Sequence, residues 1–216
     1  MTTPALHRGF IFDVDATLVD TISIINEIWK TWAEIKNLNF SDVYPHVHGR
    51  KINETLVAVD PKFNNDDDIA EVKAIAFEKM KSATAIEGAI EFVEQIPPNM
   101  WSIATSGPYN IAKTSLTASG FTLPKVMICG EDVTQGKPHP EPFLAAAKAL
   151  GIPPEQCIAF EDSPVGIQSA KAAGCYTIAL RTSHLDHELL AADTIIDNFN
   201  DISFKIENDN IHIILL

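Results

Sequence analysis

The chain has 216 residues, a length that suits one core domain with a modest insertion. Because 46% of its residues are apolar, it can bury a sizeable core, which argues against a disordered protein. The formal net charge of −13 argues against nucleic acid or an anionic membrane as the main partner. Because the protein as a whole repels anions, an anionic substrate would need local attraction from a metal, a few cations and helix N-termini.

Neither a targeting segment nor a disulfide framework is expected. The apolar run after Arg8 breaks at Asp13, and no apolar stretch is long enough to span a membrane. The three cysteines adjoin apolar runs at spacings that match no zinc pattern; they are Cys129, Cys157 and Cys175. We therefore expect a cytoplasmic protein with buried, reduced thiols, a monomer or weak homo-oligomer with no membrane or nucleic-acid partner.

The first predicted element is an apolar run at residues 10–12, typical of a strand buried on both faces. Asp13 and Asp15 follow at its carboxyl end, which is where ligands bind in open α/β sheets. Two carboxylates without a nearby Lys or Arg are electrostatically unfavourable unless a cation joins them. Hard oxygen ligands of this kind suit Mg²⁺. The alternative at this point is a strand end turned by ordinary Asp and Thr caps.

A long helical region comes next. Isoleucine and tryptophan residues recur at three- and four-residue steps over residues 22–37, which predicts an amphipathic helix. Helices are also predicted over residues 53–59 and 69–80, and the three aspartates at 66–68 suit the N-terminus of the second one. Since no strand-like run interrupts residues 20–83, we expect an all-helical insertion there.

The rest of the chain alternates between strands and helices. Strands are predicted over residues 101–105, 126–129, 157–160, 176–180 and 194–196, helices over 88–96, 110–119, 140–150 and 165–173, and a hairpin over 203–213 with its turn at 208–210. This repetition predicts a parallel sheet with helices on both faces. The expected fold is therefore α/β: a doubly wound, Rossmann-like parallel sheet formed by residues 1–19 and 84–216, with a small all-helical cap domain, residues 20–83, inserted after the first strand.

Four stretches in a fixed order resemble the motifs of one family. They are Asp13-Val14-Asp15-Ala16-Thr17, Ser102-Ile103-Ala104-Thr105-Ser106-Gly107, Gly136-Lys137-Pro138 and Phe160-Glu161-Asp162-Ser163-Pro164-Val165-Gly166. Together they resemble the haloacid dehalogenase-like hydrolases, in their magnesium-dependent phosphatase branch, from about residue 10 to about residue 199. Within that branch, the runs 101–107 and 135–143 look most similar to the small sugar- and polyol-phosphate phosphatases. One difference is Ala16, where the branch usually has glycine.

The resemblance implies roles for the acidic residues. Asp13 would be the nucleophile that forms an aspartyl-phosphate, and Asp15 the general acid and then the general base. The Asp13 carboxylate, the Asp15 backbone carbonyl and Asp162 would hold Mg²⁺, with Glu161 close by. Glu161 and Asp162 follow a predicted strand, so sheet geometry can bring them beside Asp13. The same two acids could also cap the following helix, which is compatible with this role.

Three further core residues would contact the phosphate. Thr105 ends its own predicted strand, and its hydroxyl can bind a phosphate oxygen together with Ser106. Lys137 lies in a loop before a predicted helix and would supply the positive charge that the transition-state oxygens require. Both assignments depend on the resemblance, since a strand-end Thr and a loop Lys are common in proteins.

Substrate choice is expected to lie in the cap. The segment 46–51 joins two predicted cap helices and contains His48, Gly49 and Arg50. Arg50 is predicted to contact a second phosphate or a hydroxyl group, with His48 beside it. The alternative is that this segment is a solvated linker.

These residues predict a Mg²⁺-dependent phosphomonoesterase that acts on a small phosphorylated sugar or polyol. A hexose phosphomutase, similar to β-phosphoglucomutase, would share the core and differ in acid–base groups held by the cap. A dehalogenase is disfavoured, because Asp15 and the acidic pair serve a metal that such enzymes do not use. A catalytically silent ligand-binding homologue is favoured only by Ala16.

Overall fold

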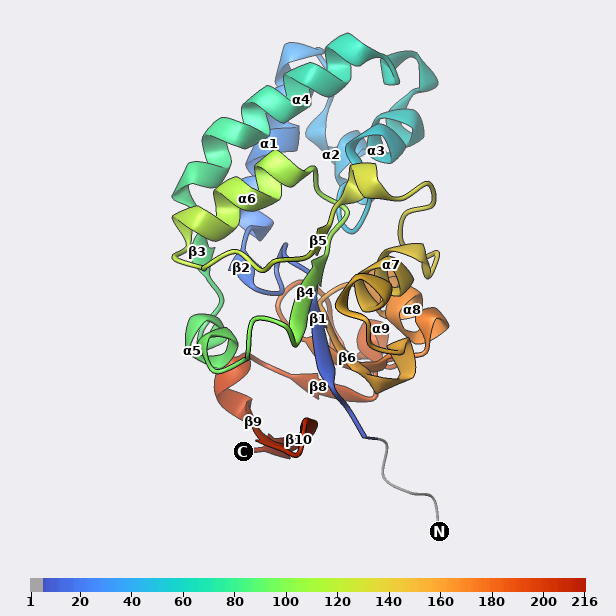
Figure 1. Cartoon of the computed structure of the whole chain (residues 1–216). Helices are drawn as coiled ribbons and strands as arrows, with labels where there is room; N and C mark the ends of the chain where they lie inside the picture. Colours follow the sequence, from blue (N-terminus) through green and yellow to red (C-terminus); the bar gives the residue numbers. More distant parts are fainter. Residues whose placement is uncertain (1–5) are drawn as a thin grey trace.

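Six parallel strands form the central sheet of the computed structural model, which describes residues 6–216 (Figure 1). Their order across the sheet is β5-β4-β1-β6-β7-β8, and their bounds are β1 Gly9–Phe12, β4 Trp101–Ala104, β5 Met127–Ile128, β6 Cys157–Glu161, β7 Tyr176–Leu180 and β8 Thr194–Ile196. The chain extends the sheet on one side of β1 with β4 and β5, and on the other side with β6, β7 and β8. In open α/β sheets such a reversal creates a ligand-binding crevice at the carboxyl ends of the strands.

Helices cover both faces of this sheet, as predicted. Because successive side chains of a strand alternate, Phe10 packs on one face against Phe92 of α5 (Ala89–Glu94), while Ile11 packs on the other beside Phe143 of α7 (Glu141–Leu150). α8 (Pro164–Ala173) lies beside α7. The predicted C-terminal hairpin is confirmed as β9 (Ile202–Glu207) and β10 (Asn210–Leu215), whose apolar side chains join the α5 face. Two further helices are α6 (Tyr109–Ala118) and α9 (Asp186–Leu189).

A helical insert stands over the carboxyl ends of the strands (Figure 1). It contains α1 (Ile22–Ile35), α2 (Phe40–Val43), α3 (Ile52–Val59) and α4 (Asp66–Lys79). Trp32, Leu56 and Val72 belong to its own apolar cluster, so the amphipathic pattern of the sequence is explained by packing inside the insert. Residues 20–83 are called the cap, and the remaining described residues are called the core.

Two small features of the cap differ from the sequence prediction. The insert follows not β1 but a second strand, β2 (Val19–Asp20), which pairs with β3 (Thr84–Ala85) to form an antiparallel stem. Helix α2 and the 3₁₀ turn Tyr44–His46 were not predicted either. Elements of two to four residues are too short to show a hydrophobic period, which is why the sequence does not reveal them.

The predictions about cysteines and membrane-spanning helices can also be compared with the structure. The thiols of Cys129, Cys157 and Cys175 are buried and unpaired, as expected. Across residues 6–216 we find no helix with both the length and the apolar character needed to cross a bilayer. Residues 1–5, which the sequence assigns to the core domain, lie outside the described residues.

Candidate active site

Residues of three motifs meet at the centre of the sheet edge. Asp13 follows β1, while Glu161 ends β6 and Asp162 follows it, and β1 pairs directly with β6. Thr105 follows β4, the neighbour of β1 on the other side. The parallel arrangement therefore brings together residues that are up to 149 positions apart in the chain, the distance from Asp13 to Asp162.

Lys137 joins two of these carboxylates. Its Nζ lies 2.5 Å from Asp13 Oδ1 and 2.5 Å from Glu161 Oε1, and its side chain is almost completely buried. Burial by itself lowers the pKa of Lys137, but the charges of Asp13 and Glu161 and their hydrogen bonds outweigh it and raise the pKa above its usual value. Lys137 is therefore a cation held beside Asp13.

Glu161 holds this lysine in place. Besides Lys137, it accepts hydrogen bonds from the backbone N–H groups of Asp162 (3.0 Å) and Ser163 (3.1 Å) and from the Ser163 hydroxyl (3.1 Å). A Cβ at Gly166 would lie 1.8 Å from Glu161 Oε1, so glycine is required there for the carboxylate to fit. Ser163 also caps α8 by accepting from Gly166 N. The residue that caps α8 is therefore Ser163, and not Glu161 or Asp162 as in the predicted alternative.

The arrangement has more negative charge than the structure's own cations balance. Carboxylate oxygens of Asp13, Glu161 and Asp162 lie within 4.8 Å of one another. Burial, together with the neighbouring carboxylates, raises the pKa of Asp13 to about 8 and places the pKa of Asp162 well above its ordinary value. The raised pKa values mean that ionising these acids together is unfavourable, and a hard divalent cation held by their oxygen atoms would offset that cost. Because both oxygens of Glu161 already accept hydrogen bonds, Asp13 and Asp162 fit direct ligation better than Glu161 does.

Asp15 is positioned by the tight turn that follows β1. Ala16 has φ +61°, and its N–H donates to Val19 O (2.8 Å) and approaches Thr21 Oγ1 (3.2 Å). Burial raises the pKa of Asp15 above its ordinary value, against an opposing hydrogen bond with Thr21. A carboxyl group whose pKa is raised can keep a proton to donate, as a general acid requires.

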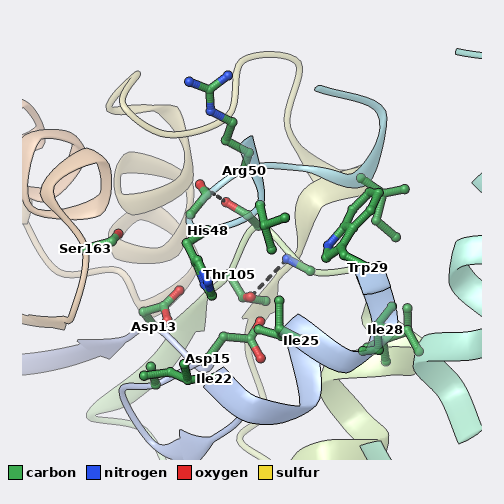
Figure 2. Close-up of a pocket in the computed structure, with 18 of the residues that line it drawn as sticks. Asp13, Asp15, Ile22, Ile25, Ile28, Trp29, His48, Arg50, Thr105 and Ser163 are labelled. Carbon is green, nitrogen blue, oxygen red and sulfur yellow. Dashed lines mark hydrogen bonds between the residues drawn. The ribbon is translucent and has the colours of Figure 1, made fainter. Parts of the chain in front are cut away.

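The predicted phosphate-binding pair, Thr105 and Ser106, follows β4. Thr105 is buried, and its Oγ1 accepts from Gly107 N at 3.0 Å. Figure 2 shows the Thr105 side chain on the same side of the cavity as Asp13 and Asp15. The Ser106 hydroxyl instead donates to Gly49 O of the cap at 3.2 Å, so it joins core and cap.

The two predicted cap residues differ in orientation. His48 points toward Asp13 and Thr105, whereas the Arg50 guanidinium extends away from the cavity at its rim (Figure 2). His48 Nε2 lies 3.1 Å from Asn26 Oδ1 of α1. Burial and the nearby His184 lower the pKa of His48, which favours a neutral ring.

The loop that follows β7 also supports the site and was not predicted from the sequence. The Ser183 hydroxyl contacts the backbone oxygen of Asp162 at 3.0 Å and also its carboxylate, and Thr182 Oγ1 donates to Ala16 O at 2.5 Å. This loop therefore fixes both a candidate metal ligand and the turn that carries Asp15. The one signal that could have found it is position, since residues 181–184 directly follow a strand adjacent to β6.

The chain is similar to known proteins in family, sequence and structure. The family model described as haloacid dehalogenase-like hydrolase matches residues 10–180. The chain is 30% identical to hexitol phosphatase A of Escherichia coli, covering 91% of this chain and 93% of that protein. It is 32% identical to validoxylamine A 7'-phosphate phosphatase of Streptomyces hygroscopicus, over 91% and 96%. Among solved structures, a family IA hydrolase from Entamoeba histolytica is similar with a TM-score of 0.76 at 26% identity, over 91% of this chain and 95% of that one.

Proposed function

Because the chain belongs to the haloacid dehalogenase-like hydrolases and is a phosphoric monoester hydrolase, we propose that it hydrolyses a small phosphorylated sugar or polyol through a phosphate ester on Asp13. The observation that carries this proposal is the placement of a buried Asp13 beside the Lys137 cation, at the crevice of the sheet. Relatives named for hexitol, glycerol-1-phosphate and 2-deoxyglucose-6-phosphate support the substrate class.

The first half of the reaction transfers the phosphoryl group to the protein. An Asp13 carboxylate oxygen attacks phosphorus, and the bond between phosphorus and the ester oxygen breaks. Asp15 gives its proton to the departing alkoxide, which leaves as an alcohol. Lys137 and the Thr105 hydroxyl stabilise the charge on the phosphoryl oxygens, the positioning and electrostatic work that phosphoryl transfer requires.

The second half restores Asp13. Asp15, now a carboxylate, takes a proton from a water molecule, whose oxygen attacks phosphorus. The bond between phosphorus and the Asp13 oxygen then breaks, and inorganic phosphate leaves. Ser183 keeps the Asp162 carboxylate oriented throughout, and Glu161 keeps Lys137 in place.

A divalent cation belongs to this proposal. The Asp13 carboxylate, the Asp15 backbone carbonyl and Asp162 would hold Mg²⁺, with Glu161 beside them. When bound, Mg²⁺ would offset the excess negative charge of the carboxylates and of the phosphate.

A trapping experiment tests the mechanism. With Mg²⁺ and a phosphate ester, the quenched enzyme should carry one added phosphate on the peptide that contains Asp13. Asp13→Asn should lose all measurable turnover, and EDTA should abolish the activity of the unmodified enzyme. Asp15→Asn should still form the phosphoenzyme from an ester with an activated leaving group, and should hydrolyse it slowly.

The products separate this proposal from its alternatives. Free phosphate and free alcohol in equal amounts support a phosphatase. Conversion of a hexose phosphate to its isomer would indicate a phosphomutase instead, and phosphate trapped on a residue other than Asp13 would overturn the mechanism.

A further inference from the structure

The imidazole ring of His48 is held in the cavity by two cap residues that lie outside it. The ring lines the cavity together with Asp13 and Thr105 and points toward both (Figure 2). Its Nε2 lies 3.1 Å from Asn26 Oδ1 on α1, and the Tyr44 ring stands edge-on to it, with ring centroids 5.8 Å apart. Neither Asn26 nor Tyr44 lines the cavity. These two residues therefore fix the direction of the ring without facing a ligand themselves.

The contact with Asn26 decides which ring nitrogen carries the proton. Because burial and the nearby His184 lower the pKa of His48, the ring is neutral near pH 7, with one N–H donor and one acceptor nitrogen. Asn26 Oδ1 is a carboxamide oxygen, which only accepts, so the proton lies on Nε2 and Nδ1 is the acceptor. Nδ1 has no hydrogen-bond partner among residues 6–216, and it is not enclosed in the interior. A small molecule can therefore reach it.

An acceptor nitrogen distinguishes a hydroxyl group from a phosphate. The ionised oxygen atoms of a phosphate have no proton to donate, so they gain nothing from Nδ1, whereas a hydroxyl group can donate to it. The phosphate already has donors on the core side of the cavity, from Lys137 and Thr105 in the proposed mechanism. Because the His48 ring points toward Asp13, a hydroxyl group that binds it lies near the phosphorylated end of the substrate.

We propose that Asn26 is a positioning residue that makes His48 the acceptor for a substrate hydroxyl group. Asn26 accepts from Nε2, and a hydroxyl group of the alcohol, close to its phosphorylated end, donates to Nδ1. This inference rests on the proposed function and narrows its substrate class to alcohols with a free hydroxyl group at that place, as in a polyol. An ester that lacks the hydroxyl group leaves Nδ1 without a partner in the complex, which lowers its affinity.

NMR spectroscopy reads the position of the proton directly. In enzyme labelled with ¹⁵N-histidine, two-bond ¹H–¹⁵N correlations identify the protonated nitrogen of each ring, and the spectrum of His48→Ala assigns the signal of His48. At about pH 7.5 we expect the proton on Nε2 in the unmodified enzyme and a mixture of the two tautomers in Asn26→Leu. A proton on Nδ1 in the unmodified enzyme would overturn the proposal.

Matched esters measure what the hydroxyl group contributes. Glycerol 1-phosphate is compared with propyl phosphate, and sorbitol 6-phosphate with hexyl phosphate, and each pair gives a ratio of kcat/KM with and without hydroxyl groups. The alcohols differ in leaving-group ability, but that difference is the same in every variant. Asn26→Leu should lower the ratio about fivefold to tenfold for the pair that is hydrolysed better. Asn53→Leu, at an exposed position of α3 outside the cavity, is the matched control and should leave the ratio unchanged.

A double variant separates positioning from a general structural role. His48→Ala should lower the ratio about tenfold by itself. If Asn26 acts only through His48, adding Asn26→Leu to His48→Ala should change the ratio by less than about twofold, because the group that Asn26 orients is already absent. Losses that multiply in the double variant, or an equal loss in Asn53→Leu, would contradict the assignment.

The inference and the proposed function fail in distinguishable ways. An unchanged ratio in Asn26→Leu would overturn the role of Asn26 and leave the phosphatase intact. Release of phosphate from 4-nitrophenyl phosphate but from none of the four esters would also overturn it, because the cavity would then recognise neither polyol. Absence of release from all five compounds, with Mg²⁺ present, would overturn the proposed function itself.

Discussion

The core side and the cap side of the cavity are built on different physical principles. On the core side a buried cation holds two carboxylates: Lys137 binds Asp13 and Glu161, and Glu161 in turn accepts hydrogen bonds from backbone N–H groups. On the cap side, α1 and α4 present apolar surface formed by the packing of helices. In the proposed mechanism, bond breaking takes place at the strand ends of the sheet, and selection among alcohols takes place at the helix faces of the cap. The two can then change independently.

Removing the central cation should damage the core side most. Lys137→Met leaves Asp13 and Glu161 buried without a counter-charge, which costs about 3–5 kcal/mol when one partner of a buried pair is removed. Turnover should fall about a thousandfold, because the transition-state oxygens lose their positive partner. Denaturant unfolding and steady-state kinetics measure the two effects.

The control for that variant lies in the cap. Lys62 pairs with Asp60 at the surface, so Lys62→Met removes the same charge where solvent already screens it. We expect stability and turnover close to those of the unmodified enzyme. A loss of turnover in Lys62→Met as large as that in Lys137→Met would show that the core and cap do not divide the work as described.

The core side is also the part of the site that the sequence predicts well. The apolar runs that form the strands are easy to recognise in the sequence. Parallel pairing places the carboxyl ends of these strands at one edge of the sheet. Asp13, Thr105 and Asp162 each lie at or just after the end of such a run, so they are expected to converge. The sequence also predicts where Lys137 lies, because Gly136, Lys137 and Pro138 are adjacent in the chain and form one short loop. Ser183 shows the limit: a lone serine after a strand has no periodic pattern, and only the pairing of β6 with β7 reveals what it contacts.

The cap side could be predicted only as far as its helices. An isoleucine at position 25 and a valine at position 72 fit the apolar face of a helix whether that face meets another helix or a cavity. The hydrophobic period therefore predicts α1 and α4 but not which of their residues line the cavity. The direction of the Arg50 side chain, away from the cavity, could not be predicted from the sequence either. In a loop, the direction of a side chain depends on the neighbouring loops.

Thiol reactivity tests whether the core stays closed in the native enzyme, with and without substrate. Cys129, Cys157 and Cys175 all lie in the core, and burial raises the pKa of each thiol to about 12. At pH 8.5, alkylation by iodoacetamide should be roughly a hundredfold to a thousandfold slower in the native enzyme than in guanidinium, with or without substrate. Rapid labelling of any one cysteine in the native enzyme, detected by mass spectrometry, would contradict this expectation.

The same thiols predict an alkaline limit. In the unfolded chain they ionise near pH 9, whereas in the folded core they remain protonated until about pH 12. The folded state therefore binds more protons across this range, and stability decreases as the pH rises from about 9 to about 12. Unfolding midpoints measured in denaturant at pH 8 and pH 10 should show the decrease, and replacing all three cysteines with alanine should reduce it.

A smaller effect is expected from the cap loop. The His48 side chain points into the cavity and that of Arg50 does not, so we expect His48 to contact the alcohol part of the ester. His48→Ala should lower kcat/KM on the best natural ester about tenfold, and Arg50→Ala should raise KM about threefold at most. Neither should change hydrolysis of a small artificial ester more than about twofold. Because the pKa of His48 is lowered, its ring stays neutral above pH 6.5, and KM should not vary between pH 7 and pH 8 on its account. Equal losses on both esters in either variant would place that residue on the catalytic side.

The smallest effect concerns Ala16, at the boundary between the two sides. Its φ of +61° costs an alanine about 1 kcal/mol, which Ala16→Gly would remove. Glycine also makes the unfolded chain more flexible, at about 0.4–1 kcal/mol, so the two contributions nearly cancel in the free energy of unfolding. The contacts that hold the turn use the backbone N–H and carbonyl of Ala16, and glycine keeps both. We therefore expect kcat to change less than about threefold. An increase of several orders of magnitude in steady-state turnover would show instead that the Ala16 methyl group blocks the reaction, and that the turn, rather than the cap, controls access to Asp13.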